Sequence, residues 1–180
     1  MSTLTAVKSK ANQAILGAHE AAASLAIYEA SLQHQGLSVV ITADSHSADQ
    51  LIAELRFFSA NQHSGKTAVL SFPDWETLPY DSFSPHQDIV SQRLLTLYRL
   101  PEMSSGILVI PVTTIMQRTP PAEFVLGNSL LLEPGQQLDI QATRARLAHT
   151  GYHSVDTVYE HGEFAVRGSI IDIFPMGSQT

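Results

Sequence analysis

The sequence contains no cysteine among its 180 residues. Disulfide bonds and thiolate zinc sites are therefore excluded, and the composition is compatible with the cytoplasmic location that we expect. Apolar runs long enough to cross a bilayer are also missing, and no apolar leader follows Met1, so we expect neither membrane insertion nor secretion. The residues that are present, 44% hydrophobic and 15% charged, are typical of a globular protein with a sizeable core.

Basic residues are scarce as well. Ten Lys and Arg stand against 17 Asp and Glu, which gives a net charge of −7, and no run of Lys or Arg interrupts this acidic balance. Nucleic-acid binding derives most of its affinity from cations that neutralise phosphates. Direct DNA binding is an alternative hypothesis, and it predicts salt-dependent gel shifts with this chain. We expect no such shifts.

Helical and strand-like patterns alternate through the first two thirds of the chain. The apolar run from Gly106 to Ile110 contains no polar residue, which predicts a strand buried on both faces. Such strands alternating with amphipathic helices predict a parallel α/β sheet covered by helices. The predicted strands cover residues 37–41, 68–72 and 106–110, and the predicted helices cover residues 20–34, 44–58 and 90–98.

Pro120–Pro121 is the best candidate for a domain boundary, because the pattern changes beyond it. We predict a first domain over residues 1–120 and a partial α+β domain over residues 121–180. The second domain is expected to hold a strand at 129–133, a helix at 140–149, and two strands at 163–166 and 169–174 joined by a tight turn at Arg167–Gly168. Because the chain ends just after a strand, we expect it to be a fragment of a longer protein.

Two segments resemble phosphate-binding loops without completing one. Ser64–Thr67 reads Ser-Gly-Lys-Thr, but it precedes a strand, whereas a phosphate loop opens a helix whose free amides hold the phosphates. The Gly17 segment does lead into a helix, yet Ala22 and Ala23 stand where Gly and Lys would be needed, and only Ser24 matches. The segment is either a nucleotide loop whose catalytic residues are lost or an ordinary alanine-rich helix start.

No other pattern indicates catalysis or metal binding. Eight histidines are scattered along the chain, and the pair His149 and His153 would share a helix face only if the helix continued past Gly151. We therefore predict no catalytic residue, no cofactor site and no metal site in this segment.

Arg167 is the candidate residue for partner binding. It lies at the predicted hairpin tip, and arginine is enriched at interface hot spots because its planar fork makes several hydrogen bonds. The alternatives are a solvated turn arginine or an internal ion pair with Glu163.

Residues 72–89 combine the only Trp, three of the nine Pro, and four acidic residues. Three prolines in so short a span exclude a regular helix or a central strand, and the aromatic content argues against disorder. We predict an ordered loop in which Trp75, Tyr80 and Phe83 are packing anchors of the first domain.

Long phrases of the sequence resemble the bacterial transcription–repair coupling factors. They are Asp74–Asp88 with Arg93–Tyr98, then Val109–Arg118, then Glu160–Gly177. The resemblance runs from about Ile15 to the end of the chain and is carried by phrases too long to be accidental.

The resemblance implies a UvrB-like region: a helicase-like domain 1a with a degenerate phosphate loop, over residues 1–120, followed by the start of a UvrA-binding domain 2. It also implies that Arg167 matches a family contact position for UvrA. Full-length members use ATP and Mg²⁺ to translocate on DNA and displace stalled RNA polymerase, through domains that are missing here. We therefore expect a non-catalytic scaffold that recruits UvrA, the alternative being a divergent P-loop ATPase domain.

Overall fold

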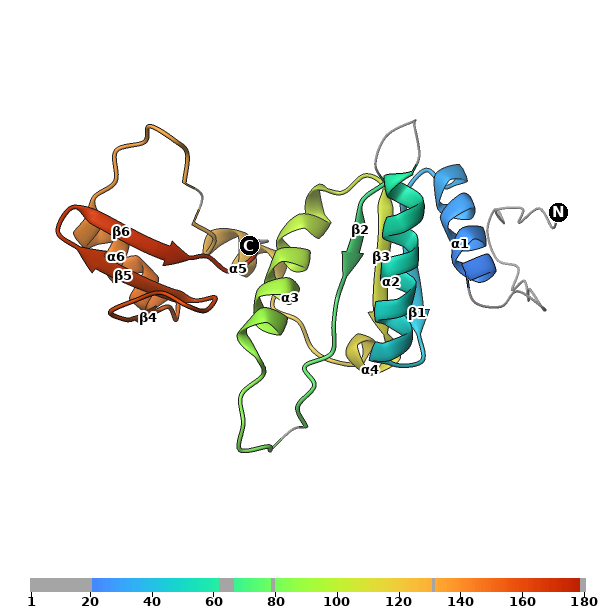
Figure 1. The fold of residues 1–180 in the computed structure, drawn as a ribbon, viewed down its shortest axis with the longest axis horizontal. Coiled ribbons are helices and arrows are strands. Elements are labelled where there is room, and N and C mark those ends of the chain that lie inside the picture. The colour runs from blue at the N-terminus through green and yellow to red at the C-terminus, as the bar shows by residue number, and fades with distance from the viewer. Residues whose placement is uncertain (1–20, 62–66, 79, 131, 179–180) are drawn as a thin grey trace. The chain divides into compact units, whose positions relative to one another are not determined.

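The computed structural model describes residues 21–61, 67–78, 80–130 and 132–178 (Figure 1). The chain divides into two compact units, each made from two stretches: residues 1–74 with 102–117, and residues 75–101 with 118–180. The boundary at Pro120–Pro121 between independently folding domains of residues 1–120 and 121–180 stays a prediction.

A parallel sheet forms the centre of the first unit. It has the strand order β1 (Leu37–Thr42), β3 (Gly106–Pro111), β2 (Val69–Ser71), and both neighbours run parallel to β3. All six residues of β3 are buried, as its unbroken apolar run predicts. The prediction of a parallel α/β sheet is confirmed.

Two helices, α1 (Ala21–Gln33) and α2 (Ser45–Ala60), lie beside each other next to this sheet (Figure 1). The α2 helix starts at Asp44, whose carboxylate accepts a hydrogen bond from the Ser47 amide at 2.7 Å. Apolar residues at helical spacing on α2 face the sheet and meet the alternate side chains of β3. The resulting core contains Tyr28, Ala48, Leu51, Ile52, Leu55, Ile107 and Val109.

Only glycine fits at the start of β3. Gly106 has φ +137°, and a Cβ built there would lie 2.6 Å from the Met103 Cε and 2.9 Å from the Ala68 carbonyl oxygen. The close approach allows the Ile107 amide to bond the Ala68 carbonyl at 2.9 Å, which brings β2 alongside β3.

Asp74 ties the carboxyl ends of β2 and β3 together. Its carboxylate accepts hydrogen bonds from the Thr113 hydroxyl of α4 (Val112–Ile115) and, at 2.8 Å, from the Gln117 amide nitrogen. A charged acceptor makes these bonds strong. The segments that leave the two strands are therefore held to each other.

The second unit contains a smaller, mixed sheet. β4 (His153–Ser154) runs parallel to β5 (Glu163–Arg167), and β6 (Ile170–Phe174) pairs antiparallel on the other side of β5. The helix α6 (Ile140–His149) contacts β4 and buries Leu147, and Phe164 of β5 is fully buried. The predicted helix at 140–149 and the predicted hairpin are confirmed, but the turn of the hairpin is Gly168–Ser169 and not the predicted Arg167–Gly168.

The unit also contains α3 (Gln87–Arg99), which a 3₁₀ turn (Leu100–Glu102) follows, and α5 (Ala122–Gly127).

The strand predicted at residues 129–133 is wrong for the residues that the structure describes, 129–130 and 132–133. The Ser129 hydroxyl donates to the Val125 carbonyl at 2.7 Å, and the Ser129 amide donates to Leu126, so the chain continues the turn that ends α5. The Glu133 amide bonds the Gln136 side chain. These donors are satisfied locally rather than in a sheet, which sequence periodicity does not reveal.

The loop before β5 is held by Glu163. Its carboxylate accepts hydrogen bonds from the amides of Tyr159 at 2.8 Å and Glu160 at 3.0 Å. These two amides hold the pKa of the Glu163 carboxyl below its usual value, because they stabilise the ionised form. The charge of Glu163 therefore fixes the path of residues 159–160.

The core of the first unit is tested by Leu55→Ala, which removes a fully buried side chain. We expect a loss of about 2–5 kcal/mol in the free energy of unfolding, from lost burial and from the cavity left behind. Urea denaturation followed by circular dichroism measures it. Arg56→Ala, a change at the next and exposed position, should stay within about 0.5 kcal/mol. Equal effects of the two substitutions would contradict the assigned core.

The role of the Glu163 charge is tested by Glu163→Gln, which keeps the side-chain shape. Because the folded-state pKa is lowered, the carboxylate stabilises the fold above the usual pKa of 4.5, and this contribution disappears as the pH falls through the folded-state pKa. We expect the variant to melt below the wild-type at neutral pH, with the gap closing under acid conditions. Thermal melts across a pH series measure this gap, and Glu160→Gln is the control. A gap independent of pH would show that the charge is unimportant.

Candidate protein-interaction surface

The Gly17 segment, which resembles a phosphate-binding loop, is partly described by the structure. Gly17 lies outside the described residues, whereas Ala22, Ala23 and Ser24 form the first turn of α1. The Ser24 hydroxyl is buried and donates to the Glu54 carboxylate of α2, which also accepts from Gln50 at 3.3 Å. A working loop would offer this hydroxyl to Mg²⁺ and a lysine to the phosphates. Here the hydroxyl is bonded to the Glu54 carboxylate, whose negative charge disfavours an anion at this position.

The Ser64–Thr67 motif does not open a helix either. Residues 64–66 lie outside the described part of the chain, and Thr67 is followed by β2, which begins at Val69. The Thr67 carbonyl accepts a bond from the Ser59 hydroxyl at 2.8 Å, at the end of α2. The segment therefore joins a helix to a strand, the reverse of the arrangement that presents a helix N-terminus to phosphate.

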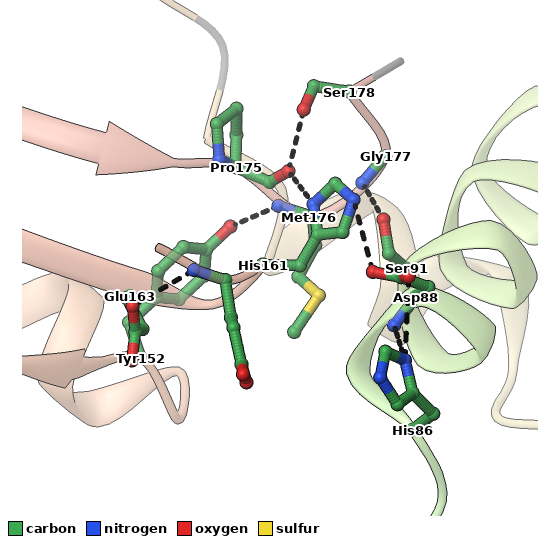
Figure 2. Close-up of polar contacts among 11 residues, drawn as sticks. His86, Asp88, Ser91, Tyr152, His161, Glu163, Pro175, Met176, Gly177 and Ser178 are labelled. Atoms are coloured by element: carbon green, nitrogen blue, oxygen red, sulfur yellow. Dashed lines mark hydrogen bonds and ion pairs between the residues drawn. The ribbon is translucent and has the colours of Figure 1, made fainter. Parts of the chain in front are cut away.

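His161 has a structural setting within the second unit (Figure 2). Its Nδ1 lies 3.0 Å from the Pro175 carbonyl oxygen, which can only accept, so Nδ1 carries the hydrogen. Its Nε2 lies 3.8 Å from the Asp88 carboxylate, and its ring is 4.3 Å from that of Phe174. In the described part of the chain, no three His, Cys, Asp or Glu side chains gather as a metal site requires. His161 thus connects the end of β6 to the start of α3.

Two further bonds reinforce this connection (Figure 2). The Gly177 amide donates to the Ser91 hydroxyl of α3 at 2.8 Å, and the Met176 amide donates to the Tyr152 hydroxyl at 2.9 Å. The segment that follows β6 is therefore bonded both to α3 and to Tyr152, and these bonds hold the hairpin in one position within its unit.

The prediction that Tyr80 and Phe83 are packing anchors is wrong. Their side chains are 104% and 80% exposed, while Trp75 is half-buried with the Arg93 guanidinium 3.9 Å from its ring centre. The Leu78 amide donates to the Asp81 carboxylate at 2.7 Å, and the Asp81 amide returns a bond to the Leu78 carbonyl. Tyr80 lies within this local turn, with φ +77°, and its side chain is exposed.

Arg167 is the last residue of β5 and is exposed. Its Nη2 donates to the Asp156 carbonyl oxygen at 3.0 Å, so the anticipated alternative of an ion pair with Glu163 is not what the structure shows. Glu163 is instead occupied by the Tyr159 and Glu160 amides. The guanidinium is held in place yet remains accessible. Its contact with a partner stays a prediction.

Two exposed residues, one of the hairpin and one of the loop before it, were not singled out by the sequence. Ile170 pairs directly with Arg167 across the hairpin and is 62% exposed, and Tyr159 in the preceding loop is 78% exposed. The predicted turn at Arg167–Gly168 would have paired Val166 with Ser169, so Ile170 was missed; the observed turn at Gly168–Ser169 pairs it with Arg167. Tyr159 could not, because its position depends on the Glu163 hydrogen bonds.

Comparisons with known proteins agree on one family. Residues 130–180 match the UvrB interaction domain family. The transcription-repair-coupling factor of Escherichia coli K12 is 46% identical over 159 residues, which cover 88% of this chain and 13% of that protein. The Haemophilus influenzae factor is 47% identical over 155 residues, which cover 86% of this chain and 13% of that protein. The Mycobacterium tuberculosis factor is 37% identical over 150 residues, which cover 79% of this chain and 12% of that protein.

The chain therefore spans only 12–13% of the length of these curated relatives. None of the helices in the described ranges is long and apolar enough to cross a membrane. The similarity extends over most of the chain, and the matched family model covers the β5–β6 hairpin. The chain belongs to the transcription-repair-coupling factor family, whose members act in DNA repair.

Proposed function

We propose that this chain is a non-catalytic scaffold that recruits UvrA to RNA polymerase stalled at DNA damage. The observation that carries the proposal is the position of Arg167, an exposed and tethered arginine at a hairpin tip, inside the segment that matches the UvrB interaction domain family. An adaptor needs an accessible contact surface on a rigid support, and the β5–β6 hairpin has both.

Arg167 is suited to this role because its guanidinium is already ordered. The bond to the Asp156 carbonyl uses one of five N–H donors and restricts the side chain before a partner arrives. The remaining donors can pair with a carboxylate of UvrA in a bidentate manner. A preordered side chain loses less conformational entropy on binding, which favours affinity.

The first unit is proposed to be a helicase-like scaffold, domain 1a, that no longer binds nucleotide. The Ala22–Ala23 sequence and the Ser24–Glu54 hydrogen bond support this reading. ATP and Mg²⁺ would be bound by the motor domains of the full-length protein, an ATP-dependent DNA translocase. RNA polymerase and DNA would likewise be engaged through parts outside this chain, in the cytoplasm.

The Arg167 assignment is tested in the full-length protein by Arg167→Ala. We expect UvrA association to weaken by about 1–3 kcal/mol, the range typical of an arginine at a partner contact. Isothermal titration with purified UvrA measures the change. Arg144→Ala, which removes an exposed arginine of α6 in the same unit, should leave the affinity unchanged. If Arg167→Ala leaves the affinity for UvrA as unchanged as Arg144→Ala does, the assignment is refuted.

The loss of nucleotide binding is tested by titrating this chain with Mg-ATP. We expect no measurable heat, because the lysine is missing from the Gly17 segment and Ser24 is bonded to Glu54. Binding that Lys66→Ala abolishes would instead support the divergent P-loop ATPase and overturn the scaffold proposal.

A further inference from the structure

The register of the β5–β6 hairpin places an apolar side chain beside Arg167. Arg167 and Ile170 are direct cross-strand partners, so their side chains project from the same face of the sheet. The turn between them is Gly168–Ser169, and Gly168 has φ +61°, a conformation that glycine adopts without strain. The pair is therefore fixed by backbone geometry, with Ile170 62% exposed.

The loop of residues 156–160 extends this face. Glu163 and Arg167 lie on either side of Ala165 along one face of β5, and both bond backbone atoms of the loop. Ala165 is 1% exposed although its cross-strand partner Asp172 is exposed, which is consistent with the loop covering it. The Tyr159 amide is held by Glu163 while its side chain is 78% exposed.

Arginine and tyrosine are the residue types that dominate binding hot spots, and an exposed isoleucine adds apolar area beside the charge. Single exposed apolar residues are ordinary on a protein surface. Here, however, a two-residue turn holds Ile170 on the face that bears the tethered arginine. Tyr159 lies in a loop whose backbone is bonded by Glu163 and Arg167 from that same face.

We propose that Ile170 and Tyr159 form a single UvrA-binding surface together with Arg167. The inference rests on the proposed function and names further residues of the same site. UvrA would supply an apolar pocket for Ile170 next to a carboxylate for Arg167. It would also supply a basic group facing Asp172, the exposed acidic neighbour of this pair.

The experiment is a titration of the full-length protein with purified UvrA. Ile170→Asp should weaken binding about tenfold or more, because it places a carboxylate in an apolar pocket, and Ile170→Val should change it less than about twofold. Tyr159→Ala should weaken binding about threefold to tenfold. Phe124→Ala is the matched control, since Phe124 is also 62% exposed in the same unit but lies on α5. Thermal melts of each variant separate lost contacts from lost folding, and Ile170→Ala replaces Ile170→Asp if the latter melts early.

The outcomes separate this inference from the proposed function. Absence of UvrA binding by the wild-type protein overturns the proposed function and the inference with it. If Arg167→Ala weakens binding while folded Ile170 and Tyr159 variants bind as the wild-type does, the inference is overturned and the proposed function stands. Weaker binding by all three variants, with Phe124→Ala unaffected, supports the single surface.

Discussion

The pairing of β5 with β6 is the constraint on which the interaction surface depends. A shift of one residue in this antiparallel ladder would exchange the two faces of β6 and remove Ile170 from the side of Arg167. Burial opposes such a shift, because Phe164 is fully buried and its partner Ile173 is half-buried on the opposite face. The hydrophobic core of the second unit thus determines which side chains a partner can reach.

The contacts at the end of β6 also hold the β5–β6 hairpin in position. The segment that follows Phe174 is held through His161, Ser91 and Tyr152, and two of these contacts link it to α3 (Figure 2). Residues 75–101 therefore belong structurally with the hairpin, although they lie far from it in the sequence. A rigid attachment favours binding, because less freedom is lost when a partner docks.

The first unit combines a three-stranded parallel sheet with the two helices α1 and α2. The side chains have other partners: Ser24 bonds Glu54, and Asp74 bonds Thr113 and Gln117. In this unit these polar residues join secondary-structure elements to each other.

The sequence by itself determined the parallel sheet, the β5–β6 hairpin and the candidacy of Arg167, because apolar periodicity and glycine turns are local signals. It failed where local hydrogen bonds competed with periodicity: Ser129 continues the turn after α5, and the Leu78–Asp81 turn contains the exposed Tyr80. Only the tertiary structure decided the partners of Arg167 and Glu163, the place of Tyr159, and the union of α3 with the hairpin. These depend on contacts between residues distant in the chain, and no residue pattern encodes such distances.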